Sequence, residues 1–146
     1  MKRKILISLF FFLSLQVFAQ GPEILWTKTF GGLNDEAPVC IQNTEDNGFI
    51  ILGTTQSYGA GQQDIYLIKT DSSGNEVWSN TYGGSSDDEG SYILTTDDGG
   101  YLMMGWTLSF TTGKIWLLRL NSIGDTLWTK HFGSGNWDGG SYMIKL

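Results

Sequence analysis

Acidic side chains gather at one recurring place in this sequence, a few residues after a Gly-Gly or Gly-Ser step. The densest group is Asp87, Asp88 and Glu89; the equivalent places elsewhere hold Asp35, Glu36 and Asp138. Calcium prefers sites that gather several oxygen ligands, but the complete Asp-x-Asp-x-Asp-Gly loop is absent. Acids that recur in every repeat are explained more simply by turn stabilisation or by solvation. We therefore predict no metal site, with Asp87, Asp88 and Glu89 as the candidate ligands should calcium bind.

The chain contains a single histidine, which limits the catalytic and metal sites that it can form. His131 is the single histidine, and the other repeats hold Thr29 and Thr81 at its position. A metal site or a Ser-His-Asp triad normally needs histidine in company. Two carboxylates can hydrolyse a glycosidic bond, but no pair of acids stands out from the repeated background. We therefore predict that the chain is not an enzyme, has no catalytic residues and uses no cofactor.

Three tryptophans break the repeat and are candidates for ligand contact. Trp106, Trp116 and Trp137 stand where the other repeats hold Thr54, Tyr66 and Asp87. Large aromatic rings serve either as core packing or as contact surfaces. We expect core packing for Trp106 and Trp116, which fall within predicted strands. Trp137 falls in a predicted loop, so we predict it as the ligand-stacking residue.

The N-terminus has the parts of a secretory signal peptide. Lys2–Lys4 is basic, Ile5–Leu15 is apolar but short for a membrane span, and Val17 and Ala19 precede a cleavage site. We predict a signal peptide over residues 1–19, a mature chain over 20–146, and no membrane span after cleavage. An uncleaved membrane anchor is the alternative.

The charge balance excludes one class of partner. The formal net charge is −6, and removal of Lys2, Arg3 and Lys4 with the signal peptide lowers it to −9. Such a surface repels phosphate backbones, so we predict that the chain binds no nucleic acid. Cations, basic proteins and neutral glycans remain compatible. Cys40 is the single cysteine, which excludes an internal disulfide framework and favours a small buried hydrophobe.

An internal repeat organises the chain. It begins near Trp26, Trp78 and Trp128, at spacings of 52 and 50 residues, and residues 26–61 align with 78–113 at 13 of 36 identical positions. Repeats of this length are typical of β-propeller blades and solenoids.

Each repeat predicts four antiparallel strands, because short apolar runs alternate with Gly-rich turns. In the second copy we expect strands at Tyr92–Thr96, Tyr101–Thr107, Ile115–Asn121 and Thr126–Phe132. Hairpin turns are expected at Glu45–Gly48 and Asp97–Gly100. Runs that are apolar on both faces indicate coverage on both sides. Gly53 and Gly105 lie inside strands, where they indicate close approach of neighbouring backbones. The predicted fold class is therefore all-β.

The architecture that fits is an incomplete β-propeller with two full four-stranded blades. Further strands are expected at Ile24–Phe30 and Tyr142–Leu146. Two blades leave apolar faces uncovered, which predicts self-association or a truncated fragment of a larger protein. A β-sandwich is the structural alternative.

Two turn motifs resemble known propeller motifs. Thr44-x-Asp46-x-Gly48 and its copy at Thr96 resemble Asp-box turns. Asp71-x-x-Gly74-x-x-x-Trp78 and its copy at Asn121 resemble the quinoprotein propeller repeat. In both, the side chain is expected to fix the turn through backbone amides, with the Trp packed against its own blade. These motifs are structural and imply neither a glycosidase nor a quinone cofactor.

The Trp-x-x-x-Phe/Tyr-Gly-Gly, Asp-Gly-Gly-Tyr and Gly-x-Thr patterns resemble the repeats of bacterial secreted β-propeller proteins. Those proteins often carry a sorting domain for type IX secretion, a pattern that this sequence does not show. The resemblance covers about residues 24–146 and implies a secreted, periplasmic or outer cell-surface location in a Gram-negative bacterium. The predicted function is a non-catalytic binding or scaffold module for a protein or glycan partner, or a fragment of such a protein. The alternative is an incomplete part of a propeller hydrolase or lyase.

Overall fold

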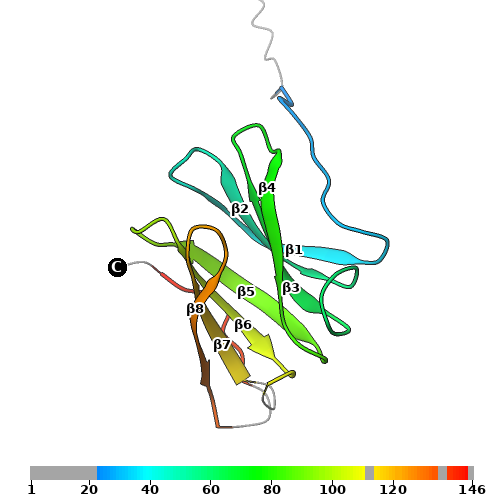
Figure 1. Ribbon diagram of the computed structural model, residues 1–146, viewed down its shortest axis with the longest axis vertical. Coiled ribbons are helices and arrows are strands. Elements are labelled where there is room, and N and C mark those ends of the chain that lie inside the picture. Colours follow the sequence, from blue (N-terminus) through cyan, green and yellow to red (C-terminus); the bar gives the residue numbers. More distant parts are fainter. Residues whose placement is uncertain (1–22, 111–113, 135–137, 145–146) are drawn as a thin grey trace, which may run out of the picture.

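The computed structural model describes residues 23–110, 114–134 and 138–144, and in these residues the chain is all-β. Eight strands form two antiparallel four-stranded sheets that lie side by side (Figure 1). We call them blade 1, with strand order β1-β2-β3-β4, and blade 2, with strand order β5-β6-β7-β8. The strands of blade 1 are β1 (Glu36–Asn43), β2 (Phe49–Thr55), β3 (Asp64–Thr70) and β4 (Glu76–Tyr82). Those of blade 2 are β5 (Asp88–Thr95), β6 (Tyr101–Thr107), β7 (Lys114–Leu120) and β8 (Thr126–Phe132).

The four predicted strands of the second repeat are confirmed, with shifted bounds at β5 and β7. β6 and β8 have the predicted bounds, and β7 begins one residue early. β5 begins at Asp88 instead of Tyr92, because Asp88 pairs with Thr107 and Glu89 pairs with Trp106. Acidic residues lower the apolar signal at this point, but the ladder to β6 fixes their backbone as strand.

Both predicted hairpin turns are confirmed. In the first, the Thr44 N–H donates to the Gly48 carbonyl at 3.0 Å, and Asn47 adopts a φ of 62°. In the second, the Thr96 N–H donates to the Gly100 carbonyl at 2.9 Å, and Gly99 has a φ of 76°. Asn and Gly tolerate this left-handed backbone better than other residues, so they fix the register of both hairpins.

The two strand glycines lie opposite bulges. The register of β1 shifts between Pro38 and Cys40, opposite Gly53, and β5 shifts in the same way opposite Gly105. A Cβ on Gly53 would stand 2.9 Å from the Ala37 carbonyl oxygen. On Gly105 it would overlap the Glu89 carbonyl oxygen. The predicted close backbone approach is confirmed, and it occurs between the first two strands of each blade.

Side chains alternate across each sheet, which gives every blade a front face and a back face. The front face of blade 1 carries Ile41, Phe49, Ile51, Tyr66 and Ile68, and its back face carries Ile50, Leu52, Ile65, Leu67 and Tyr82. The front face of blade 2 carries Ile93, Tyr101, Met103, Trp116 and Leu118, and its back face carries Tyr92, Leu102, Met104, Ile115 and Leu117.

The core is the layer between the blades. The back face of blade 1 packs on the front face of blade 2, and together they form the main cluster of buried side chains. Each fully buried Leu, Ile or Met contributes about 1.5–3 kcal/mol relative to exposure. Coverage on both sides was predicted for Tyr101–Met104 of β6 and Ile115–Leu118 of β7. It holds for their front face, whereas Leu102, Ile115 and Leu117 on the back face are half-buried. In blade 1, β3 is buried throughout.

A tryptophan joins the two blades, and the prediction that it packs against its own blade is wrong. Trp78 on β4 stands over Gly124 of blade 2, where an added Cβ would come 3.1 Å from the indole ring. It also meets Tyr101 edge to face at 6.0 Å. The hydroxyl of Tyr82 donates to the Gly124 carbonyl at 2.6 Å. The turn glycine leaves room for the ring of the preceding blade, so this motif connects blades.

The segments flanking the blades were predicted as strands, and in the described residues this is wrong. Residues 23–30 and 138–144 form no ladder, because each lies against a blade face and does not run along a strand edge. Trp26 stands over Gly74 and meets Phe49 at 5.9 Å. In Figure 1 the N-terminal segment, in blue, runs along the side of blade 1 that faces away from blade 2.

The C-terminal segment lies on the back face of blade 2. A Cβ on Gly140 would come 2.5 Å from the Met104 sulfur, and the Tyr142 ring lies 4.7 Å from that of Tyr92. Gly90 of β5 makes the equivalent contact with Leu52 of blade 1. The segment therefore lies where the first strand of a further blade would begin.

The remaining sequence expectations about the chain ends fall outside the structure. The segment predicted as a signal peptide, residues 1–19, and residues 145–146 of the predicted last strand are not among the described residues. Within the described ranges, no helix has the length and apolar character needed to cross a membrane. Cys40 lies on β1, half-buried against the core cluster.

Candidate functional site

The two ends of the blades differ in their connections. Antiparallel strands place alternate connections at the same end. At the hairpin end, tight turns join β1 to β2, β3 to β4, β5 to β6 and β7 to β8. At the loop end, the longer connection 56–63 joins β2 to β3, and the glycine-containing connection 83–87 passes from blade 1 to blade 2. Binding residues are found more often on loops held by a rigid scaffold, so the loop end is the candidate site.

Charged residues at the hairpin end fix the turns. The Asp46 carboxylate accepts from the Thr44 hydroxyl at 2.5 Å and from the Gly48 N–H at 3.2 Å. The Lys69 ammonium lies 2.7 Å from its second oxygen and also donates to the Thr70 carbonyl. The Lys69 hydrogen bond, followed by that of Thr44, lowers the pKa of Asp46 to about 2. This confirms that the Asp46 side chain fixes the turn through a backbone amide, and it adds a cation that the sequence reading missed.

Blade 2 repeats this arrangement. Asp98 accepts from Thr96 at 2.6 Å and from the Arg119 guanidinium at 2.5 Å. The hydrogen bond from Thr96, followed by that from Arg119, lowers the pKa of Asp98 to about 2. Lys69 and Arg119 occupy equivalent positions, 50 residues apart, so the recurrence of a basic residue was a usable signal.

The second turn motif is also confirmed. The Asp71 carboxylate accepts from the Ser73 and Asn75 N–H groups at 2.8 and 2.9 Å. Asn121 accepts from the Ile123 and Asp125 N–H groups at 3.1 and 2.9 Å. The polar side chains described at the hairpin end therefore accept hydrogen bonds from backbone N–H groups and stabilise the turns.

At the loop end, one acid in each blade holds the glycine loop before it. Asp88 is buried and accepts from the Gly84 N–H at 2.8 Å and the Ser109 hydroxyl at 2.5 Å. Glu36 accepts from the Gly32 N–H at 3.2 Å and the Thr55 hydroxyl at 3.1 Å. Hydrogen bonding, with Ser57 as the largest cause, lowers the pKa of Glu36. These contacts are the turn stabilisation that the recurrence of the acids favoured.

The three candidate metal ligands do not converge. Asp88 faces the glycine loop, whereas Glu89 accepts from the Trp106 indole N–H at 3.1 Å. Neighbouring residues of a strand point to opposite faces, which separates these two carboxylates. Asp87 contributes its carbonyl oxygen to the Leu108 N–H at 2.9 Å. Within the described ranges, no group of three or more metal-ligating side chains gathers at one place.

A buried carboxylate escaped the sequence reading. Asp64 is buried at the start of β3 and accepts from the Ala60 and Gly61 N–H groups at 2.9 and 3.0 Å. A Cβ on Gly83 would overlap Asp64 Oδ1 and stand 2.7 Å from Asp88 Oδ2. Gly83 thus lets two buried acids approach the same loop. Asp64 aligns with Lys114 in the other blade, so the repeat carried no signal for it.

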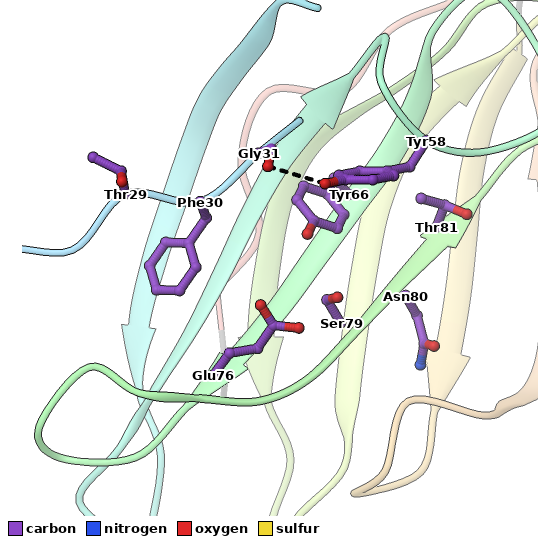
Figure 2. A pocket seen from close by; sticks show the side chains of 9 residues that line it. All are labelled: Thr29, Phe30, Gly31, Tyr58, Tyr66, Glu76, Ser79, Asn80 and Thr81. Carbon is purple, nitrogen blue, oxygen red and sulfur yellow. Dashed lines mark hydrogen bonds between the residues drawn. The ribbon is translucent and has the colours of Figure 1, made fainter. Parts of the chain in front are cut away.

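A hollow near the loop end lies between the N-terminal segment and β4, on the front face of blade 1 (Figure 2). Its volume is about 520 Å³. Neutral polar residues supply one part of the lining: Thr29, Ser79, Asn80 and Thr81. The Asn80 amide itself lies toward Gly124 of blade 2. Rings and one carboxylate supply the rest of the lining: Phe30, Tyr58, Tyr66 and Glu76. The combination offers hydroxyl hydrogen-bonding groups beside apolar rings.

Two tyrosines shape this hollow. The Tyr58 hydroxyl donates to the Gly31 carbonyl at 2.9 Å, which ties the loop of blade 1 to the N-terminal segment. The Tyr58 and Tyr66 rings lie 5.5 Å apart. Burial raises the pKa of Tyr66 above its ordinary value.

In blade 2 larger side chains occupy the equivalent place. Trp116 stands for Tyr66 and His131 for Thr81, and their rings stack at 6.0 Å with an 8° tilt. Phe110, the counterpart of Tyr58, meets Trp116 at 5.3 Å. His131 Nε2 is buried without a hydrogen-bond partner among the described residues. The hollow in blade 1 therefore reflects its smaller side chains at two positions.

The tryptophan expectations are resolved in part. Trp116 is buried and its indole N–H contacts the Thr129 hydroxyl, which confirms core packing. Trp106 is half-buried and donates to Glu89. Trp137, the predicted stacking residue, lies outside the described residues. Sequence reasoning missed the hollow, although the change from Trp and His to Tyr and Thr was visible in the alignment of the repeats.

Comparisons with known proteins name no family. No protein-family model matches this chain. A search of the curated proteins also finds no matching relative.

Proposed function

We propose that this chain is a non-catalytic binding or scaffold module that works outside the cytoplasm. Its binding site is the hollow on the front face of blade 1, and its partner is a protein or a glycan. The observation that carries this proposal is the lining of the 520 Å³ hollow, in which neutral polar groups stand beside tyrosine rings.

The chemistry of the hollow suits a neutral, hydroxyl-rich or peptide ligand. Pockets that recognise ligands combine apolar and aromatic walls with a few placed polar groups. Ser79 and Thr81 each donate and accept, while the Tyr58 and Tyr66 rings give flat apolar surface. The acidic composition of the chain disfavours phosphate-bearing partners. The signal peptide predicted over residues 1–19 supports a place outside the cytoplasm.

The alternative function is an incomplete part of a propeller hydrolase or lyase. Glu76 is the observation in its favour, because it is the one carboxylate among the described residues that line the hollow. A general acid or base of this kind needs a positioned partner group. The binding function requires no such partner and is the proposal we favour.

Calorimetric titration tests the binding function. The mature chain is titrated with neutral oligosaccharides of glucose, mannose and N-acetylglucosamine, and with short uncharged peptides. We expect one of these to bind, and the Tyr58→Ala variant to lose at least about tenfold in affinity. Phe110→Ala is the matched control, because it removes the equivalent ring of blade 2 and should leave affinity unchanged.

The same ligands decide between binding and catalysis. We expect no turnover of any ligand that binds. Turnover of a polysaccharide or peptide that Glu76→Gln abolishes would replace the binding proposal with the hydrolase or lyase alternative.

A further inference from the structure

The exposed faces of the two blades are the two halves of an interface that the chain already contains. Inside the molecule, the back face of blade 1 packs on the front face of blade 2. The front face of blade 1 is the repeat-equivalent of the second surface, and the back face of blade 2 is the repeat-equivalent of the first. Ile41 is 56% exposed, whereas its counterpart Ile93 is fully buried. Phe132 is 47% exposed, whereas its counterpart Tyr82 is 9% exposed.

The N-terminal segment shows what the front face of blade 1 accepts. Trp26 covers Gly74 and meets Phe49, and the Lys28 ammonium donates to the Asn75 side chain at 3.0 Å. Trp78 makes the same contact with the corresponding glycine of blade 2. The front face thus receives a strand whose tryptophan fits over the turn glycine.

The strand β8 carries nearly the same residues as this segment. Residues 26–30 read Trp-Thr-Lys-Thr-Phe, and residues 128–132 read Trp-Thr-Lys-His-Phe. Trp128 of β8 is 41% exposed and Lys130 is exposed. A second copy therefore presents, on its last strand, the side chains that the front face of blade 1 already binds.

The N-terminal segment is a weak occupant of that face. Its tryptophan stays 43% exposed and the segment forms no ladder. It also leaves Ile41 uncovered at the first strand. A whole blade would bring its back face as well, with Leu102, Ile115 and Leu117 in the places that Ile50, Ile65 and Leu67 take inside the molecule.

We propose that the front face of blade 1 binds β8 and the back face of blade 2 of a second copy, head to tail. Residues 138–144 of that second copy, which lie at Met104 and Tyr92 on its back face, then give way to β1 of the first copy. Trp128 of the incoming copy takes the place of Trp26 over Gly74, and Lys130 takes the place of Lys28 beside Asn75. The two surfaces differ, so the contact is heterologous and each added copy offers a new free face. At the hollow, the lining residues Thr29, Phe30 and Gly31 are exchanged for His131, Phe132 and Gly133 of the incoming copy, while the lining from blade 1 stays in place. The assembly does not depend on the proposed ligand-binding function.

A complementation experiment tests the two faces separately. Ile41→Lys places a charge on the front face of blade 1, at an exposed position that the monomer tolerates. Leu117→Glu places a charge on the back face of blade 2, where Lys130 stands directly opposite on β8. Each variant loses one half of the interface and keeps the other. Circular dichroism melting curves confirm that both variants fold.

Sedimentation velocity on the mature chain gives the readout. We expect the wild type to form species that grow with concentration, each variant alone to remain monomeric, and an equimolar mixture to form a dimer and nothing larger. If the wild type stayed monomeric at all concentrations, the front face of blade 1 would not bind a second copy, and the proposal would be overturned. A variant that associates as the wild type does, or a mixture that stays monomeric, would also overturn it.

A pair of tryptophan variants gives a second, independent readout. Trp26 and Trp128 are equally exposed, so a purely structural role predicts similar effects. In the head-to-tail contact, Trp128→Ala removes the incoming ring and weakens association at least about tenfold. Trp26→Ala removes its internal competitor and strengthens association. Equal effects of the two substitutions would contradict the contact.

Discussion

Ile41 and Ile93 occupy the same place in the two blades, but only one of them is buried. Both lie on the first strand of a blade, just beyond the bulge, and both face forward. Ile93 meets the back face of blade 1 and is fully buried, while Ile41 is 56% exposed. The residue type and the strand position are the same, so the neighbouring blade alone makes the difference.

The same contrast runs along the last strands. Tyr82 on β4 is buried against blade 2, whereas Phe132 on β8 is half exposed. The pattern of apolar residues therefore specifies which face of a blade can bury side chains against a neighbouring blade. Whether it is covered depends on what lies next to it.

The largest expected effect is that of shortening the two isoleucines. Ile93→Ala removes a buried side chain from the core, so it should lower the free energy of unfolding by about 2–4 kcal/mol. Ile41→Ala should cost less than about 1 kcal/mol in the monomer, since most of that side chain is in water. Urea denaturation at low protein concentration measures both. Equal costs would mean that the front faces of the two blades are covered alike in solution.

The tyrosine that joins the blades should give the next effect. Tyr82→Phe leaves the Gly124 carbonyl without the hydroxyl that donates to it, which should cost about 1–2 kcal/mol. Phe132→Tyr is the matched control at the exposed position and should change stability by less than about 0.5 kcal/mol. If the two substitutions cost the same, the hydroxyl contact between the blades does not form.

Alkaline titration sharpens the comparison further. Burial raises the pKa of Tyr82 from its ordinary value of 10.0 to about 12, and burial likewise raises the pKa of Tyr101 to about 12. A raised pKa contributes stability that is complete below the unfolded pKa and is lost as pH rises towards the folded pKa. The free energy of unfolding should therefore fall between about pH 10 and about pH 12. Tyr82→Phe should make this fall shallower, and an unchanged slope would contradict the burial of its hydroxyl.

The smallest expected effect comes from the hairpin ends, where the two blades do not differ. The pKa of Asp46 and that of Asp98 are each lowered to about 2 from 3.8. A lowered pKa contributes stability above the unfolded pKa that is lost as pH falls through the folded pKa. Both carboxylates are largely exposed, so solvent screening keeps each contribution small.

Acid denaturation of matched variants measures this contribution. Asp46→Asn and Asp98→Asn should each flatten the loss of stability between about pH 4 and about pH 2, and by similar amounts. A large difference between the two would show that the hairpin ends, like the faces, depend on the neighbouring blade.

Local turn chemistry made much of the fold predictable. The Asp-Gly-Gly turn before Tyr101 and the Asn-to-Asp turn before Thr126 bracket apolar runs, so β6 and β8 could be placed to the residue. The start of β5 could not, because Asp88 becomes part of a strand only through its pairing with Thr107. Strand pairing of this kind is a tertiary effect that local composition does not carry.

The site was less predictable than the fold. The acids after the glycines were found, and the structure gives Asp88 and Glu36 partners at the glycine loops. The hollow depends on how Tyr58, Tyr66 and the N-terminal segment meet in space. The contact partner of Trp78 was also not predictable, because this ring reaches a turn of the next blade, at Gly124, 46 residues further along the chain.

The tryptophan that reaches across to the next turn has a consequence for how such a chain can grow. Each blade carries a tryptophan on its last strand, which contacts the turn of the following blade. Each blade also has a glycine in its own second hairpin turn, Gly74 or Gly124, over which the tryptophan of the preceding segment fits. A tandem duplication of one repeat length, wherever it starts, copies one such tryptophan and one such glycine. Every junction in the lengthened gene product is then complementary at once, with no new mutation. A duplication of half that length would copy the tryptophan without the glycine, or the glycine without the tryptophan. Selection should therefore favour changes in length by whole repeats.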